Sequence, residues 1–301
     1  MRILIAGGTG FVGSRLTQFF KEQGHEIYIL TRNPHAQDYQ EQVSYIEWLS
    51  PHSQPETELD EIDVCINLSG TSLNSGRWTN VKKQQILESR MMTTREFIRI
   101  MGALPQKPKV FVNASAIGFY GTSEEQVFTE DTIEPGHDFL AEVCSVWETE
   151  AQEAEELGIR TVFTRFGLIL DRQEGALPKI ALPYRLMAGG RLGNGKQWMS
   201  WIHIDDVVGA IDYIIHHEKI AGPVNLTAPH PKRNQDFGRT LSSVFKKPHW
   251  LPAPSFAIRT ILGEMSILIL KGQYVYPEKL DQSGYSFKHP TLKETLENIY
   301  S

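Results

Sequence analysis

The first 32 residues contain the pattern that most restricts the fold. RILIA (2–6) is a short apolar run, GGTGFVG (7–13) follows it, and SRLTQFFKEQ (14–23) spaces its apolar residues as a helix does. Gly24 ends that helix, and EIYILTR (26–32) is a second apolar run. Strand, glycine loop, helix and strand together make up the unit that binds dinucleotides in doubly wound α/β proteins.

The glycine loop predicts a phosphate site. Amide hydrogens at a helix N-terminus and the positive end of the helix dipole attract a pyrophosphate, and glycines let the backbone approach it. The spacing, a glycine at every third position, differs from the commoner G-x-G-x-x-G. The alternative is a glycine turn in a protein without a cofactor. We predict cofactor contacts from Gly7, Thr9, Gly10, Phe11, Val12 and Gly13.

The end of the second strand indicates which dinucleotide is bound. An acidic residue there would accept a hydrogen bond from the ribose 2′-hydroxyl, but this strand ends Thr31-Arg32. A guanidinium has no acceptor and suits a phosphate dianion. We therefore predict NADP(H) in preference to NAD(H). The alternative for Arg32 is a solvated loop residue.

The apolar runs continue along the chain in alternation with helical patterns. Six strands alternating with helices predict a parallel sheet covered on both faces, which is a Rossmann fold. A strand that ends in Asn-Leu-Ser-Gly puts a small-residue turn at the carboxyl edge of the sheet, where ligands bind in such folds. The remaining strands are expected at 43–48, 63–70, 109–121 and 159–170, and the helices at 77–101 and 138–158.

Composition excludes several classes of protein. The net charge of −6 argues against a nucleic-acid-binding protein and gives no reason to expect a membrane partner. The two cysteines, Cys65 and Cys144, form no metal spacing and no disulfide framework, so we expect a cytoplasmic protein. The N-terminus lacks the features of a signal peptide, and the apolar run at 266–270 is too short to span a bilayer.

Several motifs together resemble the extended short-chain dehydrogenase/reductase superfamily. They are GGTGFVG, NLSG after the fourth strand and WIHIDDV at 201–207. A narrower resemblance, carried by NLSGTSLNSGRW, ILESR, ASAIGFYG, DFLAEVCSVWE and the C-terminal LPAPSFAIRTILGEMSILILKGQYVYPEKL, is to an atypical epimerase-like family with a small C-terminal domain of uncharacterised function. This resemblance covers essentially the whole chain.

The resemblance implies a Rossmann core, a small C-terminal substrate lobe, a preference for NADP(H) and a homodimer. It places Ser115 at the end of the fifth strand, beside the nicotinamide, and Trp201 and His203 on the substrate side. The further residues that it implies near the cofactor are Thr31, Arg32, Leu68, Ser69, Gly70, Gln85 and Arg90.

The proton-transfer pair of the superfamily is missing. Typical members carry Tyr-x-x-x-Lys on the helix after the fifth strand, and these positions map to Leu140 and Cys144. In one interpretation Tyr120 takes over as the acid, with Ser115 beside it and Arg165 on the substrate side as the nearby charge. In the other, Tyr120 packs over the cofactor, and the protein binds NADP(H) without fast turnover.

Two other motifs are discounted. GGRLGNGKQ (189–197) approaches a P-loop, but Gln197 stands where the magnesium-binding Ser/Thr is required. His203, Asp205 and Asp206 are better explained as a strand end followed by N-cap acids of a helix at 207–217. We therefore predict no metal site.

The division of the chain follows from where the alternation weakens. We predict an NADP-binding domain at 1–170, with 201–220 packing back on it, and a small α+β substrate lobe formed by 171–200 and 221–301. The lobe is expected to hold helices at 176–190 and 234–247 and a strand at 222–227.

The function predicted is that of an epimerase-like oxidoreductase. It would use NADP(H) on an unidentified small polar metabolite, such as a nucleotide sugar. The alternative is a non-catalytic regulatory protein that senses NADP(H). The missing tyrosine-lysine pair favours the alternative, and the Ser115–Tyr120 turn with a developed second lobe favours the enzyme.

Overall fold

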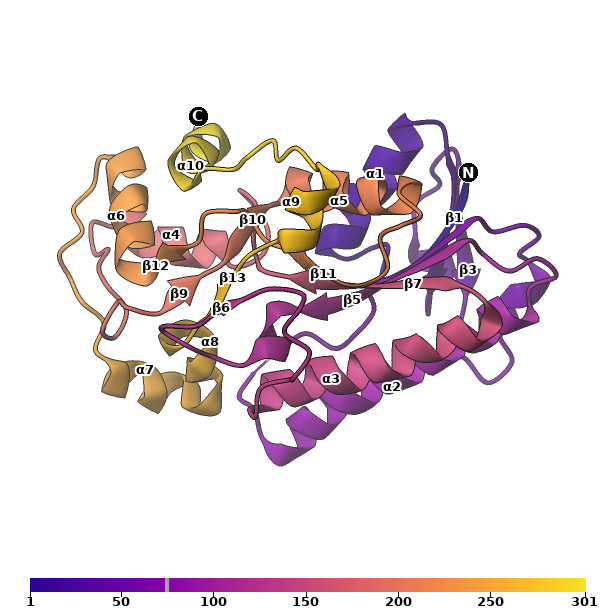
Figure 1. Ribbon diagram of the computed structural model, residues 1–301, viewed down its shortest axis with the longest axis horizontal. Helices are drawn as coiled ribbons and strands as arrows, with labels where there is room; N and C mark the ends of the chain where they lie inside the picture. Colours follow the sequence, from indigo (N-terminus) through magenta and orange to yellow (C-terminus); the bar gives the residue numbers. More distant parts are fainter. Residues whose placement is uncertain (74–75) are drawn as a thin grey trace.

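The computed structural model describes residues 1–73 and 76–301. Its central sheet has seven parallel strands in the order β11-β7-β5-β4-β1-β2-β3 (Figure 1). The predicted doubly wound Rossmann sheet is confirmed. The strands are β1 (Arg2–Ala6), β2 (Glu26–Thr31), β3 (Val43–Glu47), β4 (Val64–Asn67), β5 (Val110–Ala116), β7 (Arg160–Phe166) and β11 (Gly222–Leu226).

Helices cover both faces of this sheet. Side chains alternate along β1, so Ile3 and Ile5 enter the core against α1 (Phe11–Glu22) and α5 (Ile204–His216). Leu4 and Ala6 enter the opposite core, against α2 (Asn80–Ala103) and α3 (Phe139–Gln152). Because both faces are buried, the central strands β1 and β4 are nearly continuous apolar runs, which is why the sequence revealed them.

The assignment of the strand at 222–227 to the smaller lobe is wrong. The strand is present as β11, but it pairs in parallel with β7 and extends the central sheet. Within the segment at 201–220, α5 shares a core with α1.

The strand predicted at 159–170 is two strands. β7 ends at Phe166, and β8 (Leu168–Leu170) leaves the sheet to pair with β10 (Trp201–His203). The change of partner occurs around Gly167, because Gly167 N donates to Leu226 O whereas Leu168 N donates to Ser200 O.

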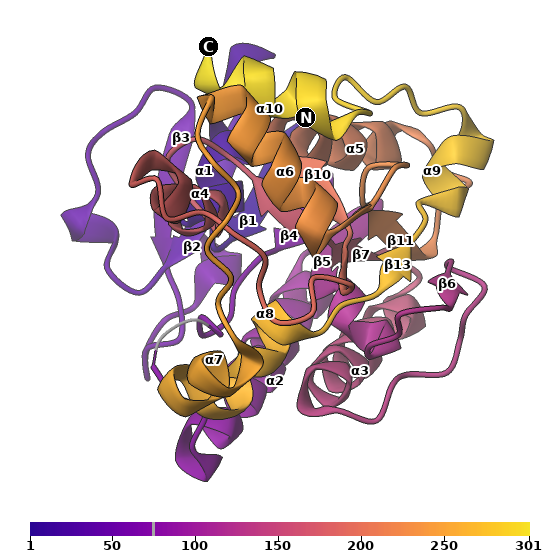
Figure 2. The ribbon, with the colours of Figure 1, turned by 90° about the vertical axis from the view of Figure 1, so that its left-hand side faces the viewer.

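The smaller lobe is built mainly from helices. α4 (Leu177–Arg185), α6 (Asn234–Phe245) and α10 (Leu292–Tyr300) enclose the fully buried Trp201. Figure 2 shows α4, α6 and α7 at this end of the molecule. The other elements are β6 (Val127–Phe128), β9 (Trp198–Met199), β12 (Lys232–Arg233), α7 (Ser255–Leu262), α8 (Ile267–Leu270), β13 (Tyr274–Val275) and α9 (Glu278–Ser283).

None of the helices in the described part of the chain is both long and apolar enough to cross a membrane.

Candidate dinucleotide site

The glycine loop lies between β1 and the start of α1, and its backbone packs so closely that Gly7 and Gly13 leave no room for a Cβ atom. A Cβ atom on Gly13 would lie 2.1 Å from the carbonyl oxygen of Gly7. Gly7 has a φ of +80°, and a Cβ there would lie 2.9 Å from the carbonyl carbon of Leu68. The loop therefore packs against the turn after β4, and the predicted loop and turn residues meet at the carboxyl edge of the sheet.

The start of α1 offers free amides to an anion. Gly10 precedes the helix and makes no side-chain cap. Ser14 N bonds to Gly10 O at 2.8 Å, so the first-turn amides of Phe11, Val12 and Gly13 come before the intrahelical ladder begins. Thr9 and Gly10 are exposed beside them. This arrangement suits a pyrophosphate.

Arg32 directly follows β2 and is exposed. Among the residues that the structure describes, it makes no ion pair or side-chain hydrogen bond. The Thr31 hydroxyl beside it accepts the amide of Asn33 at 3.3 Å. The Arg32 guanidinium is therefore available to a phosphate group.

A buried amide network holds the turn after β4. The Asn67 side chain donates to Asn113 Oδ1 at 2.8 Å and to Thr94 Oγ1 at 3.1 Å. Its own Oδ1 accepts the amide and hydroxyl of Ser69. This network fixes the Leu68-Ser69-Gly70 turn against the glycine loop, and sequence reasoning missed it because a buried asparagine carries no periodic signal.

Arg90 lies under this turn. Its guanidinium donates to the carbonyl oxygens of Thr71 and Ile86, each at 3.1 Å, and lies 4.7 Å from the Trp147 ring. The side chain is 8% exposed, has no carboxylate partner in the described chain, and leaves its Nε unpaired. Burial lowers its pKa. A buried cation of this kind favours an anionic or polar ligand at the turn. Gln85 is exposed on α2, and no described contact joins it to the loop.

Ser115 belongs to a buried ionic network. Its hydroxyl donates to Glu148 Oε1 at 2.6 Å, and Arg165 holds the same carboxylate with two hydrogen bonds of 2.8 and 2.7 Å. Ser115 and Arg165 are each 2% exposed. Both side chains bond to Glu148, while Arg165 Nη1 has no hydrogen-bond partner among the described residues. Their predicted roles beside nicotinamide and substrate stay predictions.

Tyr120 lies in the turn after β5, in a small buried cluster with Phe128, Cys144 and Val275. Its hydroxyl donates to Asn225 Oδ1 at 2.8 Å, and its ring stacks on Phe128. Burial raises the pKa of Tyr120 to about 12. A phenol that holds its proton this firmly is a weak acid at neutral pH, and its role as proton donor stays a prediction.

The positions of the missing pair lie against the turn that follows β5. A Cβ on Gly118 would lie 3.2 Å from Leu140 Cβ and 3.6 Å from Cys144 Sγ. Burial, followed by the charge of Glu148, raises the pKa of the Cys144 thiol to about 11. Neither residue can replace a tyrosine-lysine pair, because one cannot ionise and the other stays neutral.

The residues predicted on the substrate side are buried. Trp201 is fully enclosed, and its indole donates to His230 O at 3.3 Å. The prediction that Asp205 and Asp206 cap the next helix is wrong, because His203 is the N-cap and its Nδ1 accepts the amide of Asp205 at 3.1 Å. His203, Asp205 and His289 bring three metal-ligand atoms within 4.8 Å of one another. The absence of a metal stays a prediction.

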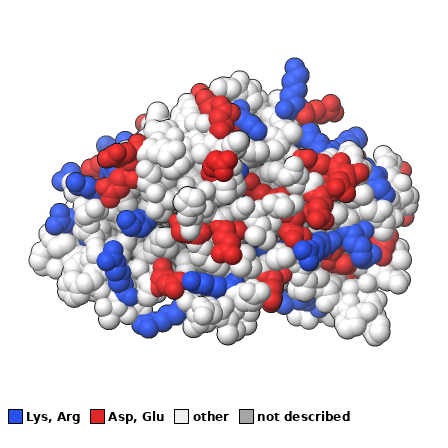
Figure 3. All heavy atoms as spheres, turned by 60° about the horizontal axis from the view of Figure 1, so that its bottom comes forward, with Lys and Arg blue, Asp and Glu red and all other residues white. Residues whose placement is uncertain are grey.

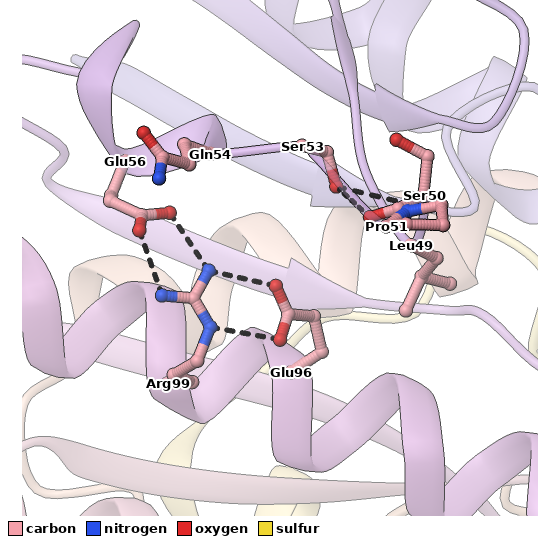
Figure 4. A pocket seen from close by; sticks show the side chains of 8 residues that line it. All are labelled: Leu49, Ser50, Pro51, Ser53, Gln54, Glu56, Glu96 and Arg99. Atoms are coloured by element: carbon pink, nitrogen blue, oxygen red, sulfur yellow. Dashed lines mark hydrogen bonds and ion pairs between the residues drawn. The ribbon is translucent and has the colours of Figure 1, made fainter.

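A surface hollow of about 480 Å³ lies elsewhere, between the segment after β3 and α2 (Figure 4). Arg99 bridges Glu56 and Glu96 across it with hydrogen bonds of 2.8 and 2.9 Å, and these bonds lower the pKa of Glu56. None of the predicted site residues lines it. Because the donors of Arg99 are satisfied internally, this hollow offers no free charge to a ligand.

Comparisons with known proteins agree with the fold. The model of the NAD dependent epimerase/dehydratase family matches residues 3–226, and a domain of unknown function matches 253–299. The epimerase family protein YfhF of Bacillus subtilis is 46% identical over 299 residues, which are 99% of this chain and 98% of the relative. The epimerase family protein MW0731 of Staphylococcus aureus is 43% identical, over 98% of each chain.

Solved structures of known proteins share the fold of this chain. The human epimerase family protein SDR39U1, crystallised with NADPH, is 29% identical and superposes with a TM-score of 0.86 over 99% of both chains. The UDP-glucuronic acid 4-epimerase of Bacillus cereus, crystallised with NAD, shares the fold at 16% identity and a TM-score of 0.78, over 100% of this chain and 96% of its own. The chain therefore belongs to the NAD dependent epimerase/dehydratase family, as an extended short-chain dehydrogenase/reductase of epimerase-like type.

Proposed function

We propose that the protein binds NADP(H) and uses it as an epimerase-like oxidoreductase on a small polar metabolite, such as a nucleotide sugar. The observation that carries the proposal is the closed glycine loop, which presents the first amides of α1 while an exposed and unpaired Arg32 follows β2. The pyrophosphate would bind the amides, and Arg32 would bind the 2′-phosphate. The NADPH in the human SDR39U1 structure supports this choice of cofactor.

The residues of this chain would position the cofactor. The nicotinamide supplies hydride, and the Leu68-Ser69-Gly70 turn with Arg90 below it would orient the adjoining ribose and phosphates. The Asn67 network keeps this turn rigid, so that little order has to be gained on binding.

Replacing Arg32 tests the cofactor assignment. We expect Arg32→Ala to weaken NADPH binding by about 10- to 100-fold, because charge-assisted hydrogen bonds to the 2′-phosphate are lost, and to leave NADH binding unchanged. Isothermal titration calorimetry measures both affinities. Arg239→Ala, an exposed arginine on α6, is the matched control and should bind NADPH as the wild type does. Equal affinity of the wild type for NADPH and NADH would contradict the proposed preference for NADP(H).

A specific observation favours a second function, a non-catalytic NADP(H) sensor. Leu140 and Cys144 occupy the positions of the proton-transfer pair, while Ser115 and Tyr120 are bonded internally. Incubating the protein with NADPH and a panel of carbonyl metabolites and nucleotide sugars separates the two functions. Oxidation of NADPH, or an epimerised sugar found by product analysis, supports the enzyme. Cofactor binding with no product from any compound supports the sensor.

A further inference from the structure

Positive charge is concentrated in two segments of the chain, 175–200 and 228–262. These segments hold ten basic residues and one acidic residue, Asp236, whereas the rest of the chain holds 20 basic and 35 acidic residues. The net charge of −6 therefore conceals a strongly basic region. Its ten basic residues are Lys179, Arg185, Arg191, Lys196, Lys232, Arg233, Arg239, Lys246, Lys247 and Arg259.

Nine of these ten cations form no ion pair within the described residues. The exception is Arg239, which lies 3.4 Å from Asp236. The basic residues of α2 behave differently, since Arg95 pairs with Glu150 at 2.6 Å and Arg99 with Glu56 at 2.8 Å. Most cations of the basic region thus have no ion-pair partner in the described chain.

Large apolar side chains are exposed in the same region. The Trp250 indole donates to Met187 O at 2.8 Å, and the amides of Trp250 and Leu251 both bond to Gly189 O, so the two segments lie side by side. Leu182 lies in the last turn of α4, and Leu186 follows one helical turn later, just beyond the end of the helix. We call these residues the α4 surface; their exposed fractions are Leu182 53%, Leu186 69%, Met187 54%, Trp250 63% and Leu251 45%.

Three cations without ion pairs in the described chain lie close in sequence to the α4 surface. Arg185 precedes Leu186 and lies over the Phe245 and Tyr300 rings, at 5.6 and 5.3 Å. Lys246 and Lys247 directly follow α6, shortly before Trp250. Because Arg185 lies over the ring of Phe245, which precedes Lys246, it belongs to the same end of the molecule as the two lysines. In Figure 3 the lower left of the molecule shows several Lys and Arg groups and an acidic group among largely uncharged atoms, and further Asp and Glu groups lie at the upper left, in the middle and at the right.

We propose that the α4 surface docks on an anionic lipid bilayer. Tryptophan, leucine and methionine gain free energy when they leave water for the bilayer interface, and unpaired lysines and arginines attract acidic headgroups. A second copy of the chain is a poorer occupant, because a two-fold interface would bring these unpaired cations against their own copies. The protein would lie on the membrane and not cross it.

Vesicle sedimentation tests the proposal with the full chain. We expect the wild type to sediment with phosphatidylcholine vesicles that contain about one third phosphatidylserine, to stay in solution with phosphatidylcholine alone, and to be released by high salt. Lys246→Glu with Lys247→Glu should weaken binding at least about tenfold, and Trp250→Ala should also weaken it. The control, Lys219→Glu with Lys288→Glu, changes the net charge equally at exposed sites outside the surface and should bind as the wild type does.

Several results would overturn the proposal. One is a wild-type protein that does not sediment with anionic vesicles. Another is loss of binding in the control to the same degree as in the Lys246 and Lys247 variant. The wild type could also fail to bind vesicles and instead form a dimer that Trp250→Ala abolishes, as measured by size-exclusion chromatography. That result would assign the surface to a second copy of the chain. Thermal unfolding and NADPH titration of each variant exclude misfolding as the cause of lost binding.

Discussion

At the scale of single residues, the surroundings of Cys144 decide which chemistry the site can support. The thiol, with a pKa near 11, is neutral at physiological pH, and Leu140 cannot ionise. The fixed positive charge that acts on this thiol comes from Arg90 on α2 and not from the usual lysine on α3. Neither Leu140 nor Cys144 can therefore supply a proton at neutral pH, and the proton-donor candidates that stay predictions are Ser115, bonded to Glu148, and Tyr120, bonded to Asn225.

Glu148→Gln is expected to be strongly destabilising. The Glu148 side chain is 10% exposed and that of its partner Arg165 is 3% exposed, so the substitution leaves a buried guanidinium without its counter-charge. We expect a loss of about 3 kcal/mol in the free energy of unfolding, measured by denaturant titration. Adding Arg165→Met should recover part of that loss, because the uncompensated charge is then gone. A double variant less stable than Glu148→Gln alone would contradict this explanation.

At the scale of elements, the sequence patterns predicted the strand, loop and helix at the N-terminus well. They did not predict which distant strands pair. The glycine loop and Arg32 could be placed from the sequence because strand, loop and helix are neighbours along the chain. The partner of β11 could not, because that choice is made by contacts with β7, some 60 residues earlier. The Ser115–Glu148–Arg165 network joins β5, α3 and β7, and nothing in local spacing indicates that these three side chains meet.

The start of α5 should make stability depend on pH. Burial, followed by the neighbouring His289, lowers the pKa of His203 to about 4 from an ordinary value of 6.5. Between pH 6.5 and 4 the unfolded chain therefore binds more protons at this site than the folded protein, so stability is lost as pH falls through that range. The contribution is on the order of 3 kcal/mol.

His203→Asn isolates this effect, because asparagine keeps an oxygen that can cap α5 but does not titrate. We expect the variant to lose less stability than the wild type when denaturant titrations at pH 6.5 and pH 4 are compared. His216→Asn, at an exposed histidine in the last turn of α5, should follow the wild type. If wild type and His203→Asn lose the same free energy, His203 is not the group responsible.

At the scale of the whole molecule, two buried carboxylates join the sheet to the C-terminal segments. Glu130 accepts the amides of Asn225 in β11 and Glu278 in α9, at 2.9 and 3.1 Å. Asp206, in the first turn of α5, accepts the amides of Lys288 and His289, at 2.7 and 2.9 Å. The two parts of the chain are therefore interleaved by hydrogen bonds between distant segments.

Asp206→Ala should loosen this junction. The Asp206 side chain is fully buried, and its removal leaves the amides of Lys288 and His289 without acceptors. We expect a loss of about 3 kcal/mol, seen as a lower melting temperature, together with faster hydrogen exchange at residues 285–289. Asp206→Asn keeps one acceptor and should lose less, and Asp205→Ala removes a largely exposed carboxylate from the same turn and should change both readouts little. Unchanged exchange at 285–289 in Asp206→Ala would show that packing of α10 on α6, and not this carboxylate, holds the end of the chain in place.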